Sequence, residues 1–124
     1  FVNKCLKDFP VQTTYFESAE QVLRKGFQTK SREENIGIPI RNCIKNKINE
    51  RINAIITLIA QKRFYYTEES ETVKEALSEA MWCPKSAEKG LDVRLDDGST
   101  DIDTLDAFEY SFERQMNRLI RAGG

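Results

Sequence analysis

The sequence predicts an α/β fold in which a short mixed sheet is flanked by helices. Two short runs, residues 11–16 and 36–40, are rich in the β-branched, aromatic and other apolar residues that favour strands. Elsewhere apolar residues recur at intervals of three and four, the period of an amphipathic helix, most clearly over residues 44–61. Strands that alternate with helices indicate a layered structure with at least some parallel pairing.

Local signals place the first elements. Phe1–Asp8 has the pattern of a helix end, which Pro10 stops because proline has no N–H and restricts the residue before it. Val11–Phe16 is the first expected strand. A helix over Ser18–Phe27 follows, since serine is a favourable N-cap, and Gly26 is expected to fray its end.

The middle of the chain predicts an edge strand and a buried helix. Ile36–Ile40 is the second expected strand, and Pro39 restricts it to an edge or a limited ladder because it cannot donate a hydrogen bond. The helix of Ile44–Gln61 is expected to pack against a sheet through six isoleucines on one side: Ile44, Ile48, Ile52, Ile55, Ile56 and Ile59.

The last third predicts one more strand and two helices. Phe64–Thr67 is a short strand, and Glu68–Met81 is a helix with an apolar side. Within the polar segment that follows, Asp92–Asp96 alternates like one arm of a hairpin. The final helix is expected over Thr100–Arg121, after a turn-forming run of Asp, Gly and Ser.

Length and composition favour a single domain over residues 1–124. The chain has 40% apolar and 31% charged residues, which is typical of a globular, soluble protein, and we expect neither a membrane-spanning run nor a signal peptide. Its first residue is Phe1, so we expect an excised fragment or a processed product.

Cysteine and histidine usage narrows the chemistry. The three cysteines, Cys5, Cys43 and Cys83, are far apart and form no Cys-x-x-Cys pair, and the chain has no histidine. Zinc fingers, Cys/His nucleophile pairs and Ser-His-Asp triads are therefore excluded. We expect buried free thiols in a reducing cytoplasm and catalysis, if any, by carboxylates, lysine or tyrosine.

The net charge of −1 conceals an asymmetry between the two halves. Residues 1–65 contain 12 Lys and Arg against 6 Asp and Glu, whereas residues 66–124 contain 7 against 14. The two charged surfaces could face each other within the fold, or a basic face could bind a polyanion beside an acidic metal pocket.

Three acids cluster at the start of the last helix. For Asp101 we expect a solvated side chain, and for Asp103 a capping or helix-dipole role at the third position if Thr100 is the cap. Asp106 lies about a right angle from the centre of the apolar face, at its margin. A half-buried carboxylate there needs a cationic partner, either a protein side chain or a metal ion.

Glu17 follows the first strand directly, at the end where open α/β sheets place their ligands. A strand-end acid in water is the simpler interpretation. Together, acids from a strand end and a helix can form part of a two-metal site for phosphodiester cleavage, with ions roughly 3.5–4 Å apart. The acidic loop from Asp97 fails the calcium-loop pattern, because Ile102 replaces the glycine and Phe108 the final glutamate. There is no Walker-type phosphate loop.

In order and spacing, three segments resemble the C-terminal nuclease domain of the large terminase subunit of tailed bacteriophages. They are Tyr15–Glu20, a hydrophobic strand ending in an acid and then Ser-Ala-Glu; Lys62–Tyr66 after the isoleucine helix, before the helix that closes on Trp82; and Asp103–Tyr110. The last is similar to the family's closing pattern of His or Asp, two residues, then Asp-Ala-Leu-Arg-Tyr. The resemblance covers roughly Thr14–Glu113.

The resemblance implies a partial RNase H-like fold and magnesium- or manganese-dependent cleavage of concatemeric double-stranded DNA in the host cytoplasm, with the portal and the small terminase subunit as partners. Glu17 would be the second acid of the two-metal site and Asp106 the last, with Asp103 assisting. The family's first acid lies on an earlier strand that this chain lacks, so the fragment is expected to be inactive alone. Glu109 replaces the common arginine and lies within the apolar stripe, where it needs a partner.

The sequence also suggests residues that could contact DNA and two alternatives to the terminase function. The candidate phosphate contacts are Arg41, Lys45, Lys47 and Arg51, although each could equally be a solvated charge. One alternative is a non-catalytic module that associates with another copy or another protein through an exposed sheet edge. The other is an RNase H-like nuclease of the resolvase or transposase type.

Overall fold

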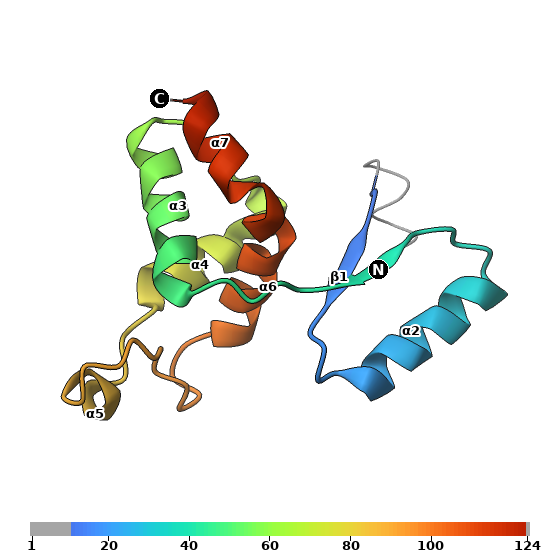
Figure 1. Ribbon diagram of the computed structural model, residues 1–124, viewed down its shortest axis with the longest axis horizontal. Coiled ribbons are helices and arrows are strands. Elements are labelled where there is room, and N and C mark those ends of the chain that lie inside the picture. The colour runs from blue at the N-terminus through green and yellow to red at the C-terminus, as the bar shows by residue number, and fades with distance from the viewer. Residues whose placement is uncertain (1–10, 124) are drawn as a thin grey trace. The chain divides into compact units, whose positions relative to one another are not determined.

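The computed structural model describes residues 11–123, which divide into two compact units, one ending at Cys43 and the other beginning at Ile44 (Figure 1). The helix end expected over residues 1–8 lies outside the described residues.

The first unit is a strand–helix–strand motif. Strands β1 (Thr14–Phe16) and β2 (Ile40–Asn42) pair in parallel, with Thr14 opposite Ile40 and Phe16 opposite Asn42. Helix α2 (Gln21–Glu33) connects them. With the helices of the second unit, this pair confirms the predicted mixed α/β class, although the strands are shorter than expected and the helices dominate.

Helix α2 differs from its prediction at both ends. It begins at Gln21, and its N-cap Glu20 makes no side-chain cap, so Ser18 is not the cap. It continues past Gly26 to Glu33, although a glycine within a helix costs about 1 kcal/mol relative to alanine. Phe27 supplies a compensating contact, because its ring lies 5.4 Å from the ring of Phe16 on β1. Tertiary packing thus outweighs the local glycine signal.

The second unit is built from helices. Helix α3 packs against α7, and α4 packs against α6 (Figure 1). The buried apolar residues come from all four: Ala54, Ile55, Ala76, Ile102, Leu105 and Met116. The helices are α3 (Ile48–Ala60), α4 (Glu71–Glu79, after a 3-10 turn over Glu68–Ser70), the short α5 (Pro84–Ala87), α6 (Ile102–Phe112) and α7 (Met116–Ala122).

The isoleucine helix does not pack against a sheet within its unit. Ile55 is buried, whereas Ile56 and Ile59 remain 57% and 51% exposed. The other side of α3 packs on α7. The regular spacing of the isoleucines therefore predicted the helix correctly, but not what lies against it.

The expected strand over residues 64–67 is not formed; Phe64 instead places its ring edge-on to Phe108, 5.9 Å away. The expected hairpin arm around residues 92–96 pairs antiparallel with the segment after α4. Cys83 donates its N–H to Val93, and Leu95 donates to Met81, both at 2.7 Å. This pairing positions Arg94 opposite Trp82.

The single helix expected over residues 100–121 is two helices. A 3-10 turn over Glu113–Gln115 separates α6 from α7. Among the described residues, no helix is both long enough and apolar enough to cross a membrane.

Candidate functional site

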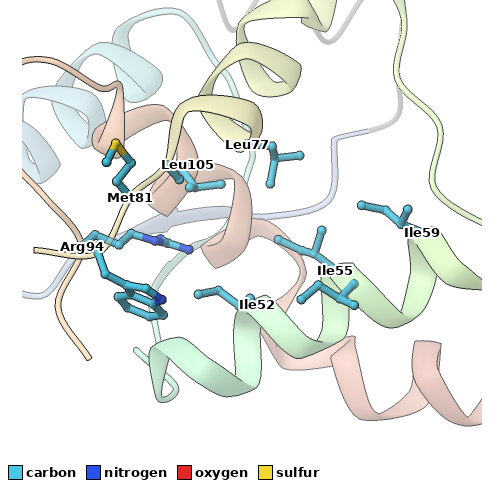
Figure 2. Close-up of a pocket in the computed structure, with 10 residues that line it drawn as sticks. Ile52, Ile55, Ile59, Leu77, Met81, Arg94 and Leu105 are labelled. Atoms are coloured by element: carbon cyan, nitrogen blue, oxygen red, sulfur yellow. The ribbon is translucent and has the colours of Figure 1, made fainter. Parts of the chain in front are cut away.

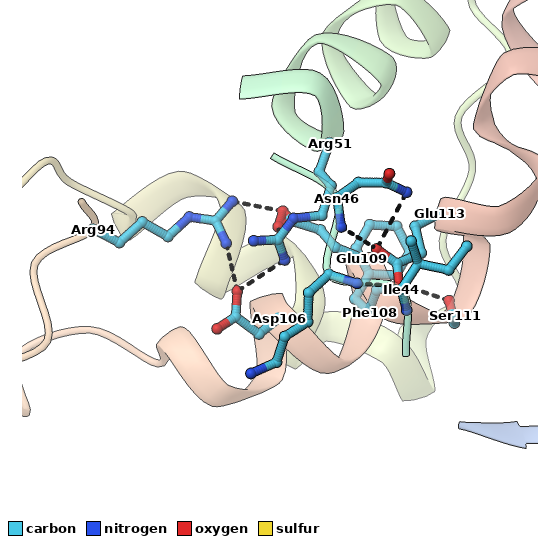
Figure 3. A network of polar contacts seen from close by, with 10 residues as sticks. Ile44, Asn46, Arg51, Arg94, Asp106, Phe108, Glu109, Ser111 and Glu113 are labelled. Atoms are coloured by element: carbon cyan, nitrogen blue, oxygen red, sulfur yellow. Dashed lines mark hydrogen bonds and ion pairs between the residues drawn. The ribbon is translucent and has the colours of Figure 1, made fainter. Parts of the chain in front are cut away.

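Asp106 belongs to a cluster of four charged side chains from three parts of the second unit (Figure 3). Arg94 donates from Nη1 to Asp106 Oδ1 at 2.8 Å and from Nη2 to Glu109 Oε2 at 2.6 Å. Arg51 on α3 lies 3.3 Å from Asp106 Oδ1 and 3.3 Å from Glu109 Oε1. One arginine thus bridges two acids one turn apart on α6, and a second arginine lies against the same pair.

The four residues differ in burial. The side chain of Glu109 is fully buried, those of Arg94 and Arg51 are 6% and 9% exposed, and that of Asp106 is 31% exposed. Two guanidinium groups face two carboxylates, so the cluster is formally neutral. Buried charges need this compensation because leaving one unpaired costs several kcal/mol. The partner that Glu109 required is therefore Arg94, supported by Arg51.

The two oxygens of Asp106 have different surroundings. All hydrogen bonds and ion pairs that Asp106 forms with described residues use Oδ1. Oδ2 lies on the side of the carboxylate away from the arginines (Figure 3). The two arginines therefore fix the orientation of the Asp106 carboxylate, while the described part of the chain does not engage Oδ2. A hard oxygen held in this way suits a divalent-metal ligand.

Two buried atoms of the cluster lack hydrogen bonds in the described chain: Glu109 Oε1 and Arg51 Nε. Glu109 Oε1 still has a charged neighbour, the Arg51 Nη1 atom at 3.3 Å. The guanidinium carbon of Arg51 also lies 5.2 Å from the centre of the Tyr110 ring, in cation–π range. Arg51 is thus held by charge and by an aromatic face.

The other two acids of the run have different roles. Asp101 is the N-cap of α6: it accepts the backbone N–H of Thr104 at 3.0 Å and its hydroxyl at 2.6 Å. These bonds lower the pKa of the Asp101 carboxyl. Asp101 is exposed, as expected, but it also caps the helix in place of Thr100, which is a correction. The Thr100 hydroxyl instead donates to Leu95 O. Asp103 is therefore the second helical residue, exposed on the outer side of the first turn.

A further acid, directly after α6, was not singled out from the sequence. Glu113 is 2% exposed, and its carboxylate accepts the backbone N–H groups of Ile44, Lys45 and Asn46 at 2.7–3.1 Å. Lys45 has a φ of 60°, which turns consecutive N–H groups inward as an anion-binding nest. Its position four residues after Glu109, about one turn along the final predicted helix, was the available signal.

Glu17 follows β1 at the carboxyl end of the parallel pair, as predicted. It belongs to the first unit, whereas Asp106 and Asp103 belong to the second. The approach of the Glu17 and Asp106 carboxylates to a shared metal therefore stays a prediction. In the part of the chain that the structure describes, no group of three or more potential metal ligands is assembled.

The candidate phosphate-contacting residues differ in their exposure to solvent. Arg41, Lys45 and Lys47 are exposed. Arg51 is 7% exposed and paired with two acids, so a phosphate could reach it only by breaking the cluster. This placement argues against Arg51 as a DNA contact.

The cysteines are less buried than expected. Cys43 and Cys83 form no disulfide within the described part of the chain and are of intermediate exposure, and Cys5 lies outside the described residues. Hydrogen bonds from the hydroxyl and backbone of Ser86 lower the pKa of Cys83.

An apolar cavity of about 330 Å³ opens beside the charged cluster (Figure 2). Isoleucines of α3 form one wall, and Leu77 of α4 with residues 80–82 after that helix forms another, with Arg94 at one end. The lining residues are Ile52, Ile55, Ile56, Ile59, Leu77, Ala80, Met81, Trp82, Arg94 and Leu105.

Comparison of the chain with protein-family models, with curated proteins and with solved structures found no match.

Proposed function

We propose that this chain is part of a divalent-metal-dependent endodeoxyribonuclease, the C-terminal portion of a terminase nuclease domain that cuts concatemeric double-stranded DNA. The observation that carries the proposal is the partial exposure and one-sided ion pairing of the Asp106 carboxylate. It is the partly exposed acid of a neutral cluster, held through one oxygen while the other is not engaged by described residues. Glu17, at the carboxyl end of a parallel strand, is its proposed partner acid.

The donor set suits Mg²⁺ or Mn²⁺, because both ions prefer carboxylate oxygens. Asp106 and Glu17 would hold the ions, with Asp103 assisting from the first turn of α6. When bound, a pair of such ions activates a water and stabilises the leaving oxygen of a phosphodiester. Arg41, Lys45 and Lys47 are the proposed contacts to the DNA backbone. The portal and the small terminase subunit are the partners that the resemblance suggests.

Metal binding by the 124-residue chain tests the proposal directly. We expect Mn²⁺ to bind, and Asp106→Asn to weaken binding roughly tenfold or more because it removes a direct ligand. Asp103→Asn, which removes an equal charge one turn earlier, should have a clearly smaller effect. Equal effects of the two substitutions, measured by calorimetric titration, would count against Asp106 as the ligand.

Cleavage should need a further acid. We expect little nicking of supercoiled plasmid by this chain with Mn²⁺, because the resemblance assigns the first acid of the site to an earlier strand. Robust nicking that Glu17→Gln abolishes would show that these residues suffice. The codons upstream of Phe1 are informative as well: an ATPase segment followed by a strand with an aspartate favours the terminase, whereas a start codon favours a separate module.

A non-catalytic association module is the second candidate. It is favoured by the sheet of the first unit, which has only two three-residue strands among the described residues. A two-stranded sheet is marginal alone, so pairing with a further strand would stabilise it. Light scattering during gel filtration tests this: a dimer that persists on dilution, together with no Mn²⁺ or DNA binding, would favour the module.

A further inference from the structure

We infer that Glu109 sets the charge of the metal site: it offsets one of the two arginines, so that Asp106 presents a neutral rather than a positive surface to a divalent cation. The inference rests on the proposed function and adds a residue to it. Glu109 is proposed neither to touch the metal nor to act on the substrate.

The charges of the cluster carry the first step. Arg51 and Arg94 contribute two positive charges within hydrogen-bond or ion-pair distance of Asp106 Oδ1. With Asp106 alone between them, the group would carry a net charge of +1 and would repel a cation. Glu109, in contact with both arginines at 3.3 and 2.6 Å, makes the sum zero.

Burial separates the two acids into different roles. Glu109 is fully buried, so it compensates the arginines without competing for a solvated ion. Asp106 is 31% exposed and uses only Oδ1 for the arginines. The nearly buried guanidinium of Arg94 connects the two, because its two terminal nitrogens each bind one of them.

Charge substitutions with opposite signs test this inference. Glu109→Gln leaves the cluster at +1 and should weaken Mn²⁺ binding roughly tenfold, because the uncompensated positive charge repels a divalent cation. Arg51→Gln leaves it at −1 and should tighten binding by a similar factor. The double variant is neutral again, keeps the bond between Arg94 and Asp106, and should bind Mn²⁺ like the unsubstituted chain.

Matched controls on the same unit change the total charge equally at exposed residues outside the cluster. Glu79→Gln and Arg121→Gln alter exposed residues and should leave the Mn²⁺ affinity within about twofold, because exposed charges are screened by salt. Circular dichroism at 222 nm establishes that each variant is folded. If Glu109→Gln does not fold, the opposite effect predicted for Arg51→Gln still tests the inference.

The outcomes distinguish the inference from the proposed function. Weaker binding by both single variants would show a merely structural role, and unchanged binding by both would show no influence of the cluster charge; either result overturns the inference. In both cases a loss of binding in Asp106→Asn would still support the proposed function. If the unsubstituted chain binds no Mn²⁺ at all, the proposed function fails and the inference fails with it.

Discussion

Removing Arg94 should destabilise the second unit far more than a typical surface charge substitution. In Arg94→Met the fully buried carboxylate of Glu109 loses its 2.6 Å hydrogen bond and, among the described residues, keeps only the Arg51 Nη1 atom at 3.3 Å as a charged partner. Removing one partner of a buried ion pair costs about 3–5 kcal/mol. The bond to the partly exposed Asp106 adds at most about 1 kcal/mol, since solvent screens it.

The expected loss is therefore about 3–5 kcal/mol, a large part of the 5–15 kcal/mol that holds a typical domain folded. Urea denaturation followed by circular dichroism measures it as a shift in midpoint. The double variant Arg94→Met, Glu109→Met is the informative control, because it replaces the pair by apolar side chains and leaves no unpaired buried charge. It should recover most of the lost stability.

A loss below about 1 kcal/mol for Arg94→Met would mean that water or another group compensates Glu109. A double variant as unstable as the single one would mean that Arg94 acts mainly by packing against its neighbours. Either result would refute the reasoning from buried charge.

Three further experiments test other contacts. Asp101→Ala should destabilise the chain more than Asp103→Ala, because only Asp101 caps α6. Hydrogen bonds lower the pKa of the Asp101 carboxyl, so its contribution to the free energy of unfolding should be complete above the ordinary aspartate pKa. That contribution should fade as the pH falls through the lowered value. The stabilities of the two variants, measured by urea titration, should therefore become similar at acid pH. Glu113→Gln should cost about 1–3 kcal/mol by weakening the carboxylate bonds to three backbone N–H groups, with increased amide exchange at residues 44–46 as the local signature. Ile55→Ala should cost about 2–4 kcal/mol and Ile56→Ala less than half of that, because Ile55 is buried and Ile56 is 57% exposed; similar values would contradict the packing of α3.

Local patterns predicted the fold class and most helices. The two strands lie within or next to the predicted runs, and the isoleucine spacing located α3. These local signals failed where contacts between residues far apart in the sequence determine the structure. Helix α2 continues past Gly26 because Phe27 meets Phe16, and residues 64–67 are not a strand because Phe64 packs on α6.

The candidate site was predictable in part. The position of Asp106 at the margin of the apolar face and the need of Glu109 for a partner both follow from helical geometry. The identity of that partner does not, because Arg94 lies in a polar segment whose pairing with residues 81–83 is a tertiary contact. For the same reason Arg51 looked like a surface charge, although it is buried against two acids.

The carboxylate of Glu113 joins the beginning of the second unit to its last third, across 67–69 residues of sequence. Closing a loop of that length costs roughly 4 kcal/mol of chain entropy before the contact forms. During synthesis from the N-terminus, residues 44–46 leave the ribosome long before Glu113 does. The segment before α3 thus waits for its acceptor until α6 has been made, so the folding of this unit is completed late and any truncation before residue 113 leaves its start unanchored.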